Sequence, residues 1–528
     1  MKYFINCFMS CILNRILNCI INCSLHCSLK YKSTLLFIAL PLLINCQSDT
    51  GLSDISAKGS QSEEAIVNQT LDTITFAQFN VSFAHDGDPQ EHFEQWVYFM
   101  NMPHSQQNKL LRMWRAGQLH ENDKKLAERI IQIRNIAAII QSVRPDVLLL
   151  NEFNNDGEGK RNEALKGFND NYLAISQSIN SVDGGARLDP ISYPYLQNFA
   201  TNTGLPSGMD LNHNGNNNGY SESDPNDAYG FGFYHGHYAF TLFSKYEIDS
   251  KNIRTFQRFK RSDLPGATQP IINVRDDEKP LPKGKKCGDN WFTDEQWKHI
   301  RLSSKNHVDA PIIVPSQNGT VTIHALLSHP TPPAFDTFSD NNKYRNSEEN
   351  LFWLHYISRD NISRNNIIRD NNTRDDIQKG DFIYDDKGKY GGLDGEHFVI
   401  MGDLNADAQV RTGADERFDG IRRLMSHPLL NQTVSQADGK FAPTSIGGAQ
   451  ANARRPHPIP ETRTSTFGVR ADYSVPSATL EVLDSGVFWA AEDQPGRLLF
   501  NDARVGKYGN GKEISSDHRL VWVTVKIP

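Results

Sequence analysis

The residues best suited to chemistry gather in residues 398–407, which read FVIMGDLNAD. A short apolar run that meets a glycine is typical of a buried strand ending at its C-terminal edge, and Asp403, Asn405 and Asp407 follow that edge. A carboxylate and an amide two residues apart on an extended backbone share one face, where they can hold one water molecule or one metal ion. The alternative is an Asx-turn of Asp403 and Asn405 that merely ends the strand, and this stretch alone favours that turn.

Two earlier strands are also expected to end in polar side chains. Residues 73–81, TITFAQFNV, alternate like a strand that ends at Asn80. Residues 124–143 have helical spacing, and 146–153, DVLLLNEF, predict a buried strand that delivers Glu152. A strand–helix–strand unit brings its strand ends to one edge, so we expect Asn80 and Glu152 to lie together. Taken singly, Asn80 reads as a turn former and Glu152 as a solvated strand end.

Residues 321–330, VTIHALLSHP, predict a further strand that carries two histidines. The prolines that follow His329 end this strand sharply, which places His329 at its tip and His324 in its middle. A histidine in mid-strand is more often a hydrogen-bonded core residue. His329 is therefore the better functional candidate of the two.

The last polar positions lie near the end of the chain. RADY contains Asp472, and SSDH contains Asp517 and His518 directly before an expected terminal strand at 520–527. An acidic residue beside a histidine is unusual at the start of a strand. The alternative is a turn with a helix-capping aspartate, and the dipeptide alone leaves that alternative ahead.

Composition sets broad limits on the function. The chain has 528 residues, 38% hydrophobic and 22% charged, which is typical of a soluble globular protein and would allow about three domains. Its net charge of −7 does not suit a tight binder of duplex nucleic acid, although it leaves room for a nuclease with local contacts. Six of the seven cysteines lie at or before Cys46, so Cys287 cannot take part in a disulfide framework of the body.

The N-terminal segment predicts export. Residues 35–44 form a ten-residue apolar run, which is too short to span a bilayer and suits the hydrophobic region of a signal peptide. The run ends in LINC, which resembles a bacterial lipobox whose cysteine becomes lipidated. We therefore expect a lipoprotein anchored to a membrane through Cys46, with plain secretion or an uncleaved anchor as alternatives. Asn45 departs from the small residue usual before that cysteine.

Composition also divides the chain. We predict an N-terminal extension with a signal or lipoprotein segment at 1–46 and a flexible tether at 47–70, which is rich in polar residues. One catalytic domain should occupy 71–528. Two polar stretches, at about 200–235 and 355–380, read as insertions into it.

The first insertion contains part of a calcium-binding pattern. Asp210, Asn212, Asn214 and Gly215 have the spacing of the first half of a calcium loop, but the twelfth position holds Ser221 and not glutamate. A flexible loop is the favoured interpretation. A structural Ca²⁺ at Asp210–Asn214 is the alternative.

Together, these polar strand ends resemble the endonuclease/exonuclease/phosphatase superfamily, which includes DNase I-like nucleases, sphingomyelinases and inositol phosphatases. The matching pieces are QFNVS, LLLNEF, LLSHPTPP, IMGDLNAD, RADY and SSDHRLVWVTV, of which GDLNAD and SDH are the most specific. The resemblance covers about residues 73–528. It implies an α/β fold, a four-layer α/β sandwich of two packed mixed β-sheets with outer helices.

The resemblance also implies roles for individual residues. Such enzymes hydrolyse phosphoesters with Mg²⁺ or Mn²⁺, and the residues that match their metal site are Asn80, Glu152 and Asp517. Asp403 matches the residue that deprotonates or orients the attacking water, and Asn405 matches one that holds the phosphate or that water.

Three further residues complete the matching set. His518 is expected to contact the phosphate, and Asp472 to accept its ring N–H and fix its tautomer. His329 matches the histidine that DNase I-like members place at the scissile phosphate, where it could protonate the leaving oxygen. Abasic-site endonucleases lack that histidine, so His329 argues against that subfamily.

The sequence leaves three functions open. The leading one is an exported, metal-dependent phosphodiesterase or phosphatase, which acts as a monomer on a small organic phosphate, a phospholipid or nucleic acid. The second is an extracellular DNase I-like endonuclease. The third is a non-catalytic surface-lipoprotein binding module, against which the intact Glu152, Asp403 and His518 argue.

Overall fold

The computed structural model describes residues 72–83, 92–216, 224–275, 278–358, 380–451, 456–506 and 511–528. These residues belong to one compact unit, Gln69–Pro528. The predicted signal or lipoprotein segment, Cys46 and the tether at 47–70 lie outside the described residues, as does most of the predicted insertion at about 355–380. No helix in the described ranges has the length and apolar character needed to cross a membrane.

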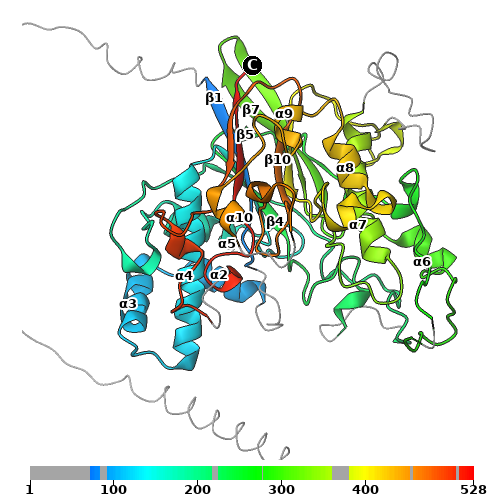
Figure 1. Ribbon diagram of the computed structural model, residues 1–528, viewed down its shortest axis with the longest axis horizontal. Helices are drawn as coiled ribbons and strands as arrows, with labels where there is room; N and C mark the ends of the chain where they lie inside the picture. The colour runs from blue at the N-terminus through cyan, green and yellow to red at the C-terminus, as the bar shows by residue number, and fades with distance from the viewer. Residues whose placement is uncertain are drawn as a thin grey trace, which may run out of the picture. The chain divides into compact units, whose positions relative to one another are not determined.

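Two mixed β-sheets form the centre of the fold (Figure 1). In spatial order, the first sheet contains β11 (Val482–Val487), β12 (Val521–Lys526), β1 (Thr73–Asn80), β2 (Val147–Asn151), β4 (Phe240–Ser244) and β3 (Tyr195–Asn198). The second contains β10 (Asp472–Pro476), β9 (Phe398–Asp403), β8 (Gly319–Ser328), β7 (His307–Ser316) and β5 (Glu247–Ile248), and β6 (Arg254–Thr255) also pairs with β7.

Each sheet has one parallel pair at its centre. In the first sheet, β1 and β2 run parallel, joined by the helix α4 (Glu121–Val143), so the predicted strand–helix–strand unit is confirmed. In the second sheet, β8 and β9 run parallel, with Ser328 opposite Gly402. The carboxyl ends of all four strands therefore carry the residues that follow Asn80, Asn151, Ser328 and Asp403.

Alternation along the strands divides the side chains between two cores. Phe76 and Leu149 of the first sheet point inward and belong to the same buried cluster as Ile400 of the second. Their neighbours in sequence, Ala77 and Leu148, point outward and pack with α4 in a second cluster. Full burial of each such aliphatic or aromatic side chain contributes about 1.5–3 kcal/mol.

Helices cover both outer faces, which gives the four-layer α/β sandwich. The cyan α4 lies on one side of the strands, and the yellow-green α7 and golden-yellow α8 lie on the other (Figure 1). The helices are α2 (Phe93–Met100), α3 (His104–Arg115), α4, α5 (Glu163–Phe168), α6 (Asp294–His299), α7 (Asn341–Ile357), α8 (Gly420–Met425), α9 (Gln432–Ser435) and α10 (Ile446–Gln450). The fold predicted from the sequence is confirmed.

The residues around Lys245 connect the two sheets. β4 belongs to the first sheet and β5 to the second, so the turn at Ser244–Lys245 carries the chain from one layer to the other. Lys245 pairs with Asp146 at 2.9 Å, at the end of β2 far from Glu152. This edge is opposite the one at which the polar strand ends gather.

Candidate active site

Asn80 joins the two sheets at the edge where the parallel strands end. Its side-chain amide lies 3.0 Å from a carboxylate oxygen of Glu152, just past β2, and 3.0 Å from a carboxylate oxygen of Asp403, at the end of β9. One nitrogen thus contacts acceptors that come from different layers. The structure brings together three residues that the sequence placed at separate strand ends.

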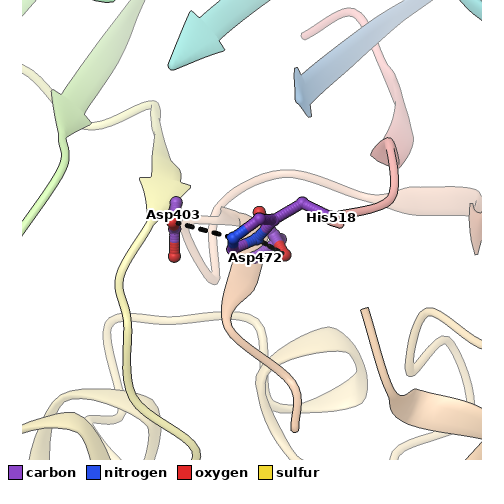
Figure 2. A group of neighbouring side chains, drawn as sticks. All are labelled: Asp403, Asp472 and His518. Atoms are coloured by element: carbon purple, nitrogen blue, oxygen red, sulfur yellow. Dashed lines mark hydrogen bonds and ion pairs between the residues drawn. The ribbon is translucent and has the colours of Figure 1, made fainter. Parts of the chain in front are cut away.

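Asp472 orients the ring of His518. β10 pairs antiparallel with β9, which sets Asp472 directly opposite Asp403. One oxygen of Asp472 lies 2.9 Å from His518 Nδ1 and also accepts a hydrogen bond from Thr464, and its other oxygen accepts one from Gln78. With both oxygens occupied, Asp472 fixes the His518 ring with Nδ1 protonated and Nε2 toward Asp403. Figure 2 shows His518 pointing toward Asp403, with Asp472 beside it.

Asp403 and His518 form a buried ion pair. His518 Nε2 lies 3.6 Å from Asp403 Oδ2, and His329 Nε2 lies 3.5 Å from the same oxygen. Burial disfavours charge on His518, but Asp472 and Asp403 outweigh it and hold the pKa of His518 well above its usual value. Burial likewise opposes ionisation of Asp403, yet His518 and His329 keep its pKa well below the usual range. The site therefore holds an imidazolium and a carboxylate at neutral pH.

His329 has the opposite electrostatic character. Burial and the positive charge of Lys305 lower the pKa of His329 to about 4, so its ring is neutral at pH 7. Its Nδ1 has no hydrogen-bond partner in the described part of the chain. His324, by contrast, lies within β8 with Nδ1 2.6 Å from Asp309, which confirms the expectation of a hydrogen-bonded core residue.

Glu152 and Asp517 supply further carboxylates on the same cleft. Burial and the negative charge of Asp517 raise the pKa of Glu152 to about 7. Ser82 donates a hydrogen bond of 2.6 Å to Asp517. Ser82 and Glu152 both follow strand ends and both adopt positive φ angles, of 50° and 59°. Residues other than glycine rarely adopt positive φ angles, and those that do are often held in place at functional sites by the surrounding structure.

The oxygen donors here fit a divalent cation. The carboxylates of Glu152 and Asp517 are hard ligands of the type that Mg²⁺ and Mn²⁺ prefer, and a cation would relieve their mutual repulsion. Asn80 lies beside them with its nitrogen on Glu152 and its oxygen accepting from the N–H of Ser82, so it positions Glu152. Asp403, Asp472 and His518 also place potential ligand atoms within 4.8 Å of one another. Because Asp472 already accepts from three donors, we interpret that trio as a hydrogen-bonded relay and the first set as the metal ligands.

Asn405 shows that the two interpretations of GDLNAD are compatible. Its backbone N–H donates to Asp403 at 3.0 Å, so the Asx-turn forms, with a φ of 53° at Asn405. The turn also places Asn405 on the cleft, where its amide donates to the carbonyl of Pro330 at 3.1 Å. Asp407 instead binds His457 at 2.9 Å and the backbone N–H of Arg470. The turn is thus the device that presents Asn405.

A cleft of about 1060 Å³ opens onto these groups. The predicted site residues that line it are Glu152, His329, Asp403, Asn405, Asp517 and His518. Asn80 and Asp472 are fully buried behind them. Aromatic side chains form another part of the wall: Phe231, Phe233, Tyr238, Trp291, Phe335 and Phe338. A second groove, of about 870 Å³ and lined by Lys343, Arg411 and Arg417, shares Arg411 and Phe467 with the cleft.

The polar loop beside the cleft satisfies many of its own polar groups. Asn212 and Asn214 both donate side-chain hydrogen bonds to Asp224, and Asp210 accepts one from the backbone of Asn214 at 3.1 Å. Ser221 lies outside the described residues. Bound Ca²⁺ stays a prediction.

Some supporting residues had no signal in the sequence. Gln78 and Thr464 bind Asp472 from 394 and 8 positions away, and Ser516 donates to the carbonyl of Asn80 at 2.6 Å. Such partners become visible only when the sheets are packed. Asp472 itself was predicted, because RADY is part of a recognisable set.

Comparisons with known proteins place these features in context. The Endonuclease/Exonuclease/phosphatase family matches residues 78–518. Similar solved structures include a protein of that description from Beutenbergia cavernae, at 12% identity over 87% of this chain and 72% of the other (TM-score 0.35).

Two Bacteroides structures are also similar. The Bacteroides vulgatus one has 11% identity over 86% of this chain and 99% of the other (TM-score 0.33). A mannosyl-6-phosphatase of Bacteroides thetaiotaomicron has 11% identity over 86% and 100% (TM-score 0.34). No curated protein matches the chain.

Proposed function

Because the chain belongs to the endonuclease/exonuclease/phosphatase family, we propose that it is a divalent-metal-dependent hydrolase of phosphoester bonds. The observation that carries this proposal is the convergence of Glu152, Asp403 and His518 on one cleft, from two different sheets. A non-catalytic binding module would have no need for a buried imidazolium between two carboxylates, which is costly to assemble.

Glu152 and Asp517, with the amide of Asn80 behind Glu152, would hold Mg²⁺ or Mn²⁺. When bound, the ion neutralises charge on the phosphoryl oxygens. The protein's contribution is to keep both acids close in spite of their repulsion: Ser82 fixes Asp517, and Asn80 fixes Glu152. Loading the site would lower the raised pKa of Glu152.

His518 would bind the phosphoryl group as a cation. Asp472 holds its Nδ1–H, so the Nε2–H is left to face the cleft beside Asp403. A preorganised charged donor of this kind stabilises the charge that develops during phosphoryl transfer. Asp403 is ionised and fixed by Asn80, which suits it to orient the attacking water by accepting its hydrogen bond.

His329 would act on the leaving oxygen. Its ring is neutral in the free protein, and an anionic substrate beside it would raise its pKa and favour the protonated form. Asn405 would contact the phosphate or the water from the other end of the Asx-turn.

The cleft favours a small or medium phosphoester as substrate. Its volume of about 1060 Å³ is close to the range of small-molecule pockets, about 300–1,000 Å³. Its aromatic wall offers a surface for a planar or apolar leaving group. Nucleic acid is the second candidate, favoured by the adjoining groove with Lys343, Arg411 and Arg417, which could follow a phosphate backbone.

We also propose that the protein acts as a monomer outside the cytoplasm. The proposal of export rests on the leader-like residues 1–46 and on Cys46. Labelling with a radioactive fatty acid, and its loss in Cys46→Ser, would test the lipid anchor.

The experiment that tests the activity is a matrix of metals and substrates. Purified protein is incubated with Mg²⁺, Mn²⁺ or Ca²⁺ and with p-nitrophenyl phosphate, bis-p-nitrophenyl phosphate or plasmid DNA. We expect metal-dependent release of nitrophenol that EDTA abolishes. Nicking of the plasmid without release from either small ester would favour the endonuclease, and no activity with any metal would favour the binding module.

A further inference from the structure

Lys305 is a buried cation in the wall of the cleft. Its side chain lies directly before β7, is 6% exposed and lines the same cavity as Glu152, His329 and Asp403. Across the described ranges, its ammonium makes no hydrogen bond and no ion pair within 4 Å. Burial of the lysine side chain without a protein partner for its ammonium costs hydration free energy, which a ligand in the cleft could restore.

The backbone around Lys305 is held firmly in place. Its carbonyl accepts a hydrogen bond of 2.9 Å from the N–H of Asn202. The neighbouring Ser304 N–H donates to Glu349 at 2.7 Å, and the amide of Asn306 donates to the carbonyl of Ala200 at 2.9 Å. The ammonium therefore faces the cleft from a fixed base.

Carboxylates near Lys305 offset the effect of its burial without forming an ion pair with it. Burial lowers its pKa, while the carboxylates of Glu349, Glu152 and Asp403 oppose that shift. Glu349 is itself occupied, since its two oxygens accept from the N–H groups of Ser304 and Thr331. The acids facing the cleft therefore favour a cationic Lys305 without binding it directly, and its three N–H donors stay available to a ligand.

We propose that Lys305 is a catalytic residue whose ammonium contacts a non-bridging oxygen of the bound phosphoryl group, alongside His518. This rests on the proposed function. The cleft then offers two cationic donors that belong to the protein: an imidazolium fixed by Asp472 and an ammonium fixed by the segment before β7. Both act where negative charge increases during the reaction. The competing role is structural, in which Lys305 only offsets the surrounding acids.

The test compares Lys305→Met and Lys305→Arg with Lys245→Met. Lys245 is a matched control, because its ion pair with Asp146 lies at the opposite edge of the sheets. With Mg²⁺ and bis-p-nitrophenyl phosphate, we expect kcat/KM to fall about 100-fold or more in Lys305→Met, to recover partly in Lys305→Arg, and to change less than twofold in Lys245→Met.

Two constants separate the catalytic role from the structural one. If Lys305 binds the phosphoryl group, the inhibition constant of inorganic phosphate should rise at least tenfold in Lys305→Met, while the Mg²⁺ concentration for half-maximal activity changes little. A structural role predicts tighter Mg²⁺ binding and unchanged inhibition by phosphate. Values of kcat/KM and of the phosphate constant within twofold of wild type would overturn the proposal while leaving the hydrolase intact.

Two other results are also decisive. If Lys305→Met does not unfold cooperatively, Lys305→Gln takes its place, because it keeps a polar head group of similar length. If wild type hydrolyses no ester, the proposed function fails, and titration calorimetry with inorganic phosphate in the presence of Mg²⁺ decides for Lys305. Phosphate binding in wild type that is lost in the variant supports the contact, and its absence in wild type overturns it.

Discussion

His518 lies between two carboxylates that do different work. Asp472 accepts hydrogen bonds on both of its oxygens and fixes the ring, whereas Asp403 faces the other ring nitrogen across 3.6 Å. The first is buried behind the ring, and the second lines the cleft. Removing either should therefore harm the reaction in a different way.

Asp403→Ala and His518→Ala should each abolish metal-dependent hydrolysis, with a loss of at least about 10³-fold in kcat. In the proposed mechanism Asp403 orients the water and His518 binds the phosphoryl group, and no neighbouring residue is placed to take over either role. Steady-state rates on bis-p-nitrophenyl phosphate measure the loss, and circular dichroism checks the fold. Turnover close to wild type in either folded variant would show that the site is assigned wrongly.

Asp472→Asn should lower kcat by about 10²-fold and leave KM nearly unchanged, because the ring of His518 loses its fixed tautomer. The chain offers a matched control in Asp309→Asn, since Asp309 holds the buried ring of His324 in the same way and neither residue lines the cleft. That variant should lose stability but keep kcat. Equal losses of kcat in both would indicate that the effect is on folding and not on His518.

A single functional residue could be predicted from the sequence when it lies within a short recognisable motif. GDLNAD and SDH contain Asp403, Asn405, Asp517 and His518 within short motifs. Lys305 lies in RLSSKNHVD, where nothing distinguishes it from a surface lysine until its burial is seen. The roles proposed for all of them remain predictions.

At the scale of elements, the buried strands near the centre of each sheet were the most predictable. β1, β2, β8, β9 and β12 lie close to their predicted positions, because continuous or alternating apolar runs specify them. β7 was not predicted, since Pro311 and Pro315 within it argue against a strand. Yet it pairs with β8 along its whole length, so tertiary pairing overrides the local preference.

Bound metal should stabilise the edge at which β2 ends and β12 begins, because Glu152 follows β2 and Asp517 precedes β12. In millimolar Mg²⁺, the unfolding temperature of wild type should rise, because ion binding relieves the repulsion between Glu152 and Asp517. When the Mg²⁺ concentration is a hundred times its dissociation constant, the free energy of unfolding rises by about 2.7 kcal/mol. Differential scanning calorimetry measures it, and Glu152→Gln should show little or no shift. An equal shift in that variant would place the ion elsewhere.

The contact between β7 and α7 predicts that the folded protein becomes less stable at acidic pH. His307 binds Ser303 through Nδ1 and donates from Nε2 to the carbonyl of Glu349 at 2.9 Å. Burial lowers its pKa to about 4, below the 6.5 of an unfolded chain, so protons bind the unfolded state more readily. The stability that His307 contributes is therefore present above pH 6.5 and is lost as the pH falls toward 4.

Urea titrations of wild type and His307→Gln between pH 7 and pH 4 test this. The difference in unfolding free energy between them should narrow by up to about 3 kcal/mol as the pH falls. The other titratable groups contribute equally to the unfolding free energy of both proteins, so their contributions cancel in the difference. A difference that stays constant over this range would contradict the assignment.

At the scale of the whole molecule, the fold class could be predicted from the order of the strands, helices and motifs along the chain. The strand–helix–strand pattern near the N-terminus predicted parallel strands with polar residues at their ends, and the resemblance of the motifs to a known superfamily predicted the two paired sheets that the structure shows. The cleft could not be predicted, because its aromatic wall comes from stretches such as 229–238 and 331–338 that have no periodicity of their own. Only the packing of both sheets brings those loops face to face.

The amide of Asn80 has one partner in each sheet, so the geometry of the proposed active site depends on how the two sheets are aligned. A small sliding of one sheet over the other would break the hydrogen bond between Asn80 and Asp403 and move Glu152 relative to Asp403. Catalysis should therefore fail early on gentle heating or in dilute urea, while circular dichroism still reports an intact backbone. The turnover rate would therefore report small losses of native structure that circular dichroism does not detect.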